Sequence, residues 1–161
     1  MVETIQMSQK PRKSEKTALM CAGDILSRQD HSEARLRQKL IFRKYSEEEI
    51  DDAIEKLKKY NYLNDERSCT NQFDIMYSSN RYSVRQICFK LVQLGFDEHL
   101  VESCVPKDYM EHDEIVAKRL LQVKFKTMPE DKKLWNFLST KGFDYTTVSS
   151  AINEFKNEND S

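Results

Sequence analysis

Residues 32–40 read SEARLRQKL, and residues 83–91, which follow at an offset of 51 positions, read SVRQICFKL. In both stretches a serine precedes two apolar residues that stand four positions apart. A further offset of 47 leads to residues 130–138, EDKKLWNFL, where leucines occupy the same two positions. Apolar residues at this spacing lie on one face of an α-helix. The chain therefore repeats one helical pattern three times.

The correspondence continues beyond these stretches. The offset of 51 pairs Tyr45 with Phe96, and the offset of 47 pairs Gly95 with Gly142. Each of these glycines stands where a helix ends, and glycine adopts the left-handed conformation of such an ending without steric cost. Lys44 holds this place in the first repeat. We therefore expect the turn at Lys44 to be more strained or differently built.

These patterns predict an all-α protein of three tandem three-helix repeats that form an elongated, curved molecule. Capping-box patterns at Ser46 and Ser83 mark two of the helix starts. The nine expected helices cover residues 17–29, 32–44, 46–60, 64–80, 83–94, 97–105, 110–126, 130–141 and 144–156. The expected repeats cover residues 17–60, 61–106 and 107–156, between flexible tails at 1–16 and 157–161.

The composition favours a cytoplasmic protein without catalytic machinery. No apolar run approaches the length that crosses a bilayer, and residues 1–16 have no signal-peptide core. The four cysteines form no CxxC pair, so we expect small buried thiols in a reducing compartment and no metal site. No glycine-rich phosphate loop or catalytic constellation is visible. We expect no enzyme activity and no cofactor.

Positive charge is the feature that we single out as a candidate binding site, although the formal net charge is −1. Arg35, Lys39 and Arg43 recur at four-residue spacing on one expected helix. Cations at corresponding places in all three repeats complete the candidate contacts, which are Arg28, Arg35, Lys39, Arg43, Arg81, Arg85, Lys90, Lys132 and Lys133. A solvated helix face explains this pattern about as well as a contact for DNA phosphates or for an acidic protein surface.

Three stretches resemble the RecX family, and together they extend over residues 17–156. They are HSEARLRQKL at 31–40, YLNDER at 62–67 and LSTKGF at 138–143. The chain departs from the family pattern at Lys44, where a glycine is expected, at Asn64, where an acid is expected, and at Tyr82, where a glycine is frequent. These departures concern local turn geometry.

The resemblance implies a regulator that binds the RecA filament on single-stranded DNA. Such a protein is expected to restrain filament growth, ATP hydrolysis and recombination, and to meet single-stranded DNA through the filament. We expect a monomer that has no membrane partner. Two alternatives remain open, a helical repeat protein that binds DNA directly and a helical adaptor for another protein partner.

Overall fold

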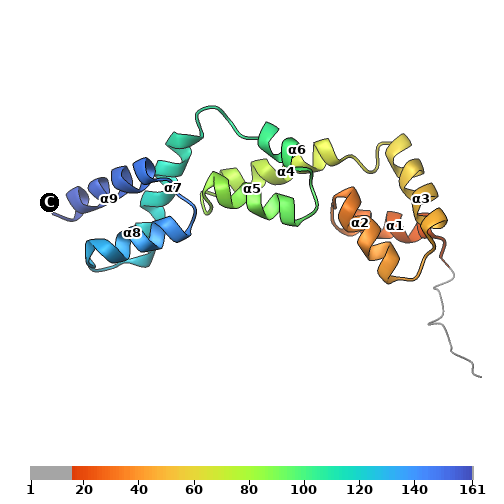
Figure 1. Cartoon of the computed structure of the whole chain (residues 1–161), viewed down its shortest axis with the longest axis horizontal. Coiled ribbons are helices and arrows are strands. Elements are labelled where there is room, and N and C mark those ends of the chain that lie inside the picture. Colours follow the sequence, from red (N-terminus) through yellow and green to blue (C-terminus); the bar gives the residue numbers. More distant parts are fainter. Residues whose placement is uncertain (1–15, 161) are drawn as a thin grey trace, which may run out of the picture. The chain divides into compact units, whose positions relative to one another are not determined.

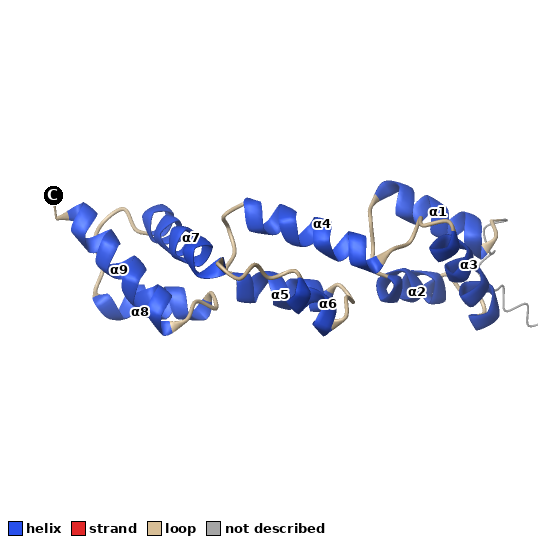
Figure 2. Ribbon diagram, turned by 90° about the horizontal axis from the view of Figure 1, so that it is seen from above, coloured by secondary structure: helices blue, strands red, loops and turns tan. Residues whose placement is uncertain are grey.

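The computed structural model describes residues 16–160, which contain nine α-helices and no β-strand (Figures 1 and 2). The helices are α1 (Ala18–Arg28), α2 (Glu33–Phe42), α3 (Glu47–Lys59), α4 (Asp65–Ser78), α5 (Val84–Gln93), α6 (Glu98–Ser103), α7 (Tyr109–Lys124), α8 (Asp131–Thr140) and α9 (Tyr145–Asn159). The all-α prediction is confirmed. Most of the predicted tail at 1–16 lies outside the described residues.

The carboxyl end of α9 differs from the prediction. The helix continues to Asn159, so residues 157–159 are helical and the predicted tail at 157–161 is wrong for them. Phe155 is buried on this helix, and the Glu158 carboxylate accepts a hydrogen bond from Gln122 of α7 at 3.0 Å. Lys118 of α7 also pairs with Glu158. These contacts with α7 anchor the last turn of α9. The apolar pattern of the sequence does not extend into this turn and so does not predict it.

The chain divides into two compact units, residues 1–65 and residues 66–161. The first unit contains α1–α3 and ends with the first residue of α4. The second unit contains the rest of α4 and the helices α5–α9. The three repeat boundaries remain a prediction.

Polar side chains fix where most helices begin. Six N-cap residues accept a hydrogen bond from a backbone N–H of the first turn, and they are Thr17, Ser32, Ser46, Ser83, Asp97 and Asp144. At Ser46 the cap is reciprocal, because the Glu49 carboxylate accepts from the Ser46 N–H at 2.8 Å. The predicted capping box is therefore present at α3.

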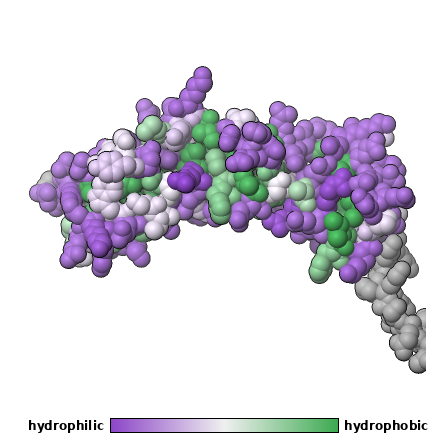
Figure 3. Space-filling model, in the orientation of Figure 1, coloured by the Kyte–Doolittle hydropathy of each residue, from purple (hydrophilic) through white to green (hydrophobic). Residues whose placement is uncertain are grey.

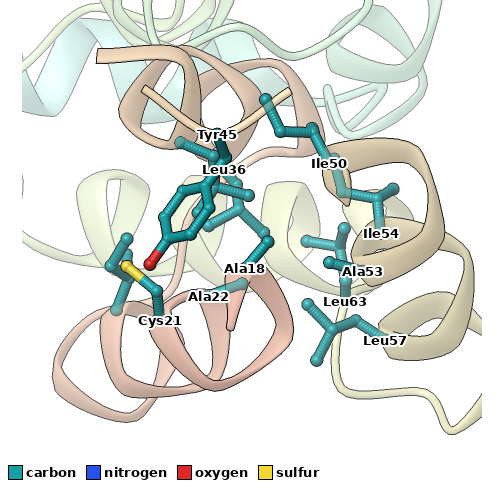
Figure 4. Packing of buried hydrophobic residues seen from close by; sticks show 12 residues of the cluster. Ala18, Cys21, Ala22, Leu36, Tyr45, Ile50, Ala53, Ile54, Leu57 and Leu63 are labelled. Atoms are coloured by element: carbon teal, nitrogen blue, oxygen red, sulfur yellow. The ribbon is translucent and has the colours of Figure 1, made fainter. Parts of the chain in front are cut away.

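The core of the first unit is small and closed by all three of its helices (Figure 4). Leu36 and Leu40, the leucines of the repeated pattern, have no exposed surface. The Tyr45 hydroxyl donates a hydrogen bond to the Lys16 carbonyl at 2.8 Å, so the polar end of this buried ring is satisfied. One face of α3 contributes Ile50, Ile54 and Leu57 to this core.

The second unit holds two core clusters. Residues from α4, α5 and the α6 region form one, which includes Phe73, Ile87 and Leu91. Residues from α7, α8 and α9 form the other, which includes Leu134 and Leu138. Within residues 16–160, no helix is both long enough and apolar enough to cross a membrane.

The three helix endings share one backbone form. Lys44, Gly95 and Gly142 have φ values of 70°, 98° and 89°. In the first ending the Tyr45 N–H donates a hydrogen bond to the Leu40 carbonyl at 3.4 Å. In the third, the Phe143 N–H donates to the Leu138 carbonyl, also at 3.4 Å. The turn at Lys44 is therefore built like the others, and lysine bears the strain of a left-handed residue.

The start of two helices is completed by a carboxylate from the second helix further along the chain, α4 for α2 and α7 for α5. The Glu33 N–H of α2 donates to Asp65 Oδ1 at 2.8 Å, within the first unit. The Val84 N–H of α5 donates to Asp113 Oδ1 at 3.0 Å, within the second unit. Burial raises the pKa of both carboxyl groups, although the backbone hydrogen bond opposes it.

Candidate functional site

The first unit gathers three of the predicted contact residues around one pocket. Arg28 lies in the last turn of α1, Lys39 lies on α2, and Arg43 is the C-cap of α2. The short link from Gln29 to Ser32 folds α2 back on α1, which brings these cations to a cavity of about 330 Å³. The other lining residues are Lys16, Asp24, Ile25, Gln29 and His31.

The pocket is strongly positive. Its four permanent cations, Lys16, Arg28, Lys39 and Arg43, face one carboxylate, which leaves an excess of three positive charges. That carboxylate, Asp24, is paired with Lys16, and this hydrogen bond lowers its pKa. Clustered cations in a concave site concentrate an attractive potential for anions. The pocket is therefore suited to a phosphate or carboxylate group.

The Arg43 side chain is held in place by α1. Its Nη1 donates to the Sγ of Cys21, a buried cysteine, at 3.0 Å. This contact directs the guanidinium toward α1 and the pocket rather than along the outer face of α2. Arg43 therefore does not continue the predicted row of Arg35 and Lys39 along α2, because it is the C-cap that follows the last helical residue.

His31 adds a titratable group to the pocket wall. Partial burial lowers its pKa first, and the positive charges of Lys39 and Arg35 lower it further. An anion in the pocket would act in the opposite direction and favour the imidazolium. Arg35 itself lies on α2 one turn before Lys39, close enough for its charge to affect His31.

Two large apolar side chains precede Arg43 and face solvent. Ile41 is 60% exposed and Phe42 is 84% exposed. Figure 3 shows apolar surface within the mostly hydrophilic first unit on the face displayed. An exposed aromatic residue beside cations is typical of a protein-binding surface, since aromatic and arginine side chains supply most interface energy. This pair gives the surface around the pocket an apolar contact that DNA phosphates would not use.

The remaining predicted residues lie in the second unit and do not share one arrangement. Arg81 is exposed just before α5, and the Arg85 side chain lies beside Gly142. Lys90 Nζ lies 4.9 Å from the centre of the Tyr82 ring. Lys132 and Lys133 are exposed in the first turn of α8.

Two acidic residues near the start of α3, and one on α2, have structural partners. Glu49 completes the capping box, and Asp51 accepts a hydrogen bond from Arg37 of α2 at 2.6 Å. Glu33 of α2 pairs with Lys58 at 3.2 Å. No group of three or more metal-ligating side chains occurs within residues 16–160.

Lys16 and His31 are pocket residues that the sequence does not predict as contacts. Lys16 falls within the predicted tail at 1–16, and His31 is not among the candidate contact residues. No spacing rule connects either residue to Arg43, because their proximity arises from the fold of α1 against α2. The Tyr45 hydroxyl bond to the Lys16 carbonyl fixes the backbone of that residue.

Comparisons with known proteins identify the family. A family model described as RecX, first three-helix domain, matches residues 18–57. Regulatory protein RecX of Neisseria gonorrhoeae is 31% identical over 154 residues, which cover 93% of this chain and 96% of that protein. Regulatory protein RecX of Caldanaerobacter subterraneus subsp. tengcongensis is 31% identical over 130 residues, which cover 80% of this chain and 66% of that protein.

A solved structure supports the same fold. The crystal structure of RecX from Lactobacillus salivarius aligns with a TM-score of 0.70 at 22% sequence identity. The alignment covers 86% of this chain and 94% of that chain. Because the Neisseria relative matches over nearly its whole length and the family model matches the first three helices, this chain belongs to the RecX family of regulatory proteins.

Proposed function

We propose that this protein binds the RecA filament on single-stranded DNA and inhibits its ATPase, its growth and recombination. Membership of the RecX family supports RecA as the partner. The observation that carries a binding role is the cationic pocket of Arg28, Lys39 and Arg43. The pocket lies within the first unit, so binding through it requires only one copy of the chain. The proposed monomer acts in the cytoplasm, where RecA meets DNA.

The pocket and the exposed apolar pair would divide the work of binding. The cations Arg28, Lys39 and Arg43 would meet acidic groups or phosphates of the nucleoprotein filament. Phe42 would provide the apolar anchor that a protein partner requires. A surface with both features fits a filament of protein and nucleic acid better than it fits free DNA alone.

The decisive experiment is a titration of the single-stranded-DNA-dependent ATPase of RecA with the full chain. We expect inhibition at substoichiometric protein. The pocket variant Arg28→Gln, Lys39→Gln, Arg43→Gln should require about tenfold more protein, since three exposed charge contacts of about 0.5 kcal/mol each amount to roughly one decade. The absence of both inhibition and filament binding by the unmodified chain would refute the proposal.

A charge-matched control separates the pocket from general electrostatics. Lys107, Lys124 and Lys126 are exposed lysines of the second unit that are outside the pocket. Changing all three to Gln removes the same formal charge, and we expect this variant to inhibit RecA nearly as well as the unmodified chain. Equal losses in the two triple variants would show that net charge, and not the pocket, governs binding.

The apolar contact has its own matched pair. Phe42 on α2 and Phe89 on α5 are both exposed phenylalanines at the surface of a helix. We expect Phe42→Ala to weaken inhibition and Phe89→Ala to leave it unchanged. Neither change removes a buried side chain, so circular dichroism should show the same helix content in both. A larger loss of inhibition in Phe89→Ala than in Phe42→Ala would indicate that the protein contact lies in the second unit.

Direct DNA binding is the second candidate, and the chemistry of the pocket favours it. Each phosphate neutralised by the pocket would release counterions, so affinity for single-stranded DNA without RecA should fall with salt. Loss of one phosphate contact in the pocket variant should reduce the slope of log K against log salt by about 0.7. Binding that requires RecA, or that requires another protein in place of RecA, would exclude this candidate.

A further inference from the structure

Two cysteine sulfurs face each other in the core of the second unit. Cys69 lies on α4 and Cys104 is the C-cap of α6, and their Sγ atoms are 3.8 Å apart. Cys69 is fully buried, whereas Cys104 is partly exposed. The hydroxyl of Thr70, an exposed residue, lies 3.9 Å from the Cys104 sulfur. The pair therefore reaches from the core to the protein surface at Cys104.

Three of the four equivalent positions in the other repeats carry alanine, and the fourth, the equivalent of Cys69 in the third repeat, is Val116. The offset of 51 pairs Cys69 with Ala18 and Cys104 with Ala53, and the offset of 47 pairs Cys104 with Ala151. All three alanines are buried. The helix packing of this fold therefore accommodates hydrocarbon side chains at these places, and packing alone does not require sulfur.

We propose that Cys69 and Cys104 are a modification site that hydrogen peroxide or an organic peroxide converts to a disulfide. The Cys104 thiolate attacks a peroxide oxygen, the O–O bond breaks, and Cys104 becomes a sulfenic acid. The Cys69 sulfur then attacks the Cys104 sulfur, the S–O bond breaks, and water leaves with the Cys69 proton. Two thiols are oxidised to one disulfide while hydrogen peroxide is reduced to two waters.

The geometry decides the order of these steps and the choice of partner. Cys104 is the more exposed sulfur of the pair, so the peroxide reaches it first. A disulfide is about 2.05 Å long, so the sulfurs must approach each other by less than about 2 Å, and side-chain rotation supplies most of such a movement. Cys104 ends a helix of only six residues. Such a short helix moves by a small distance more easily than a long helix does.

The other two cysteines are internal controls. Cys21 lies in the first unit and accepts a hydrogen bond from Arg43. Cys88 lies on α5 and is partly exposed, and burial raises the pKa of its thiol, which lowers the fraction of reactive thiolate. The site thus predicts one specific crosslink among four thiols, not general oxidation.

The test starts from the fully reduced chain. After treatment with hydrogen peroxide, the remaining thiols are alkylated in denaturant, and digested peptides are mapped by mass spectrometry. We expect the intact chain to lose two hydrogens, the alkylation count to fall by two, and a Cys69–Cys104 peptide pair to appear. A reductant should reverse all three changes, and the oxidised chain should melt several degrees higher because a crosslink restricts the unfolded state.

Alanine variants sharpen the result, and at the position of Cys69 alanine is the residue of the first repeat, Ala18. Cys88→Ala should form the crosslink as the unmodified chain does. Cys69→Ala should fail to form it and should accumulate Cys104 sulfenic acid, which dimedone traps. A Cys88–Cys104 crosslink, or further oxidation of Cys104 in the unmodified chain without any crosslink, would overturn the proposal. The mapping of the unmodified chain decides the matter even where a variant folds poorly.

Discussion

The first and second units use the same two local structures in different surroundings. Each unit has a left-handed residue after a helix, Lys44 in the first and Gly142 in the second. Each also completes a helix start with an aspartate from the second helix further along the chain, Asp65 in the first and Asp113 in the second. Lys44 is exposed and Asp65 is only partly buried, whereas Asp113 is buried.

The difference follows from what packs against each structure. A Cβ added at Gly142 would lie 3.1 Å from the Ser83 hydroxyl and 3.4 Å from Arg85 Cβ. The Ser83 hydroxyl also donates to the Lys141 carbonyl at 2.7 Å, so α5 lies directly against this turn. Lys44 is an exposed residue, and lysine is tolerated there. The same left-handed backbone is therefore tightly packed at Gly142 in the second unit and exposed at Lys44 in the first, where a charged side chain fits.

The largest expected effect separates the two aspartates. Asp113→Ala leaves the buried Val84 N–H without its acceptor and removes the carboxylate 3.2 Å from His112 Nδ1. We expect a loss of about 3 kcal/mol in the free energy of unfolding of the second unit. Urea unfolding followed through Trp135, the single tryptophan, measures it.

Asp65→Ala is the matched variant. Water can replace a partly exposed carboxylate as the acceptor for Glu33, so we expect a loss of about 1 kcal/mol. Amide hydrogen exchange provides a local measurement. The Val84 amide should lose far more protection in Asp113→Ala than the Glu33 amide loses in Asp65→Ala. Equal losses of protection would remove burial as the source of the difference.

The next effect concerns the packed glycine. Gly142→Ala combines a left-handed φ of 89° with the close approach of Ser83, so we expect a loss of about 2 kcal/mol. Thermal melting with Trp135 fluorescence records the change. Lys44→Ala replaces one side chain by another at the corresponding turn, and its melting temperature should stay within a degree or two of the original. A similar loss in both variants would mean that the contact with Ser83 contributes nothing.

A smaller effect of opposite sign is expected at Lys44. Lys44→Gly relieves roughly 1 kcal/mol of left-handed strain, and the greater freedom of glycine in the unfolded chain offsets part of it. We expect a net gain of about 0.5 kcal/mol, measured by urea unfolding followed by circular dichroism. The RecA titration serves as a control, because Lys44 does not line the cationic pocket. A loss of stability would show that the side chain of Lys44 makes a stabilising contact.

The smallest expected effect is a dependence on pH. Burial raises the pKa of Asp113 in the folded protein, so the folded state binds this proton more tightly than the unfolded state does. The contribution of Asp113 to stability therefore falls as the pH rises from about 4, the usual carboxyl pKa, through its raised value. Asp113→Asn keeps an oxygen acceptor for Val84 and removes this titration.

The measurement is the difference in unfolding free energy between Asp113→Asn and the unmodified chain from about pH 4 to pH 7. We expect the variant to gain relative to the unmodified chain as the pH rises. A difference that is flat across this range would show that Asp113 titrates alike in the folded and unfolded states.

Most of the helices could be predicted from local signals. The start of α2 is a serine cap followed by apolar residues at four-residue spacing, and such signals act within one turn of helix. The same holds at Ser46 and Ser83. The last turn of α9 was missed because it is anchored by Lys118, which is distant in sequence.

The candidate site was only partly predictable, for the same physical reason. Lys39 and Arg43 share one helix spacing, so their proximity follows from periodicity. Lys16 and His31 join them only when α1 and α2 pack together. The approach of the Arg85 side chain to Gly142 likewise depends on where α5 and α8 lie in the folded second unit, which no local pattern states.

The aspartates that complete α2 and α5 also set an order of assembly during synthesis. The acceptor for the Glu33 amide is made 32 residues later, and the acceptor for the Val84 amide is made 29 residues later. Each helix therefore leaves the ribosome with an unfinished first turn and closes it only after the second helix further along the chain has begun. A fragment that stops at Leu63 would keep its core and lack this closure, so expression fragments of the first unit should extend through Asp65.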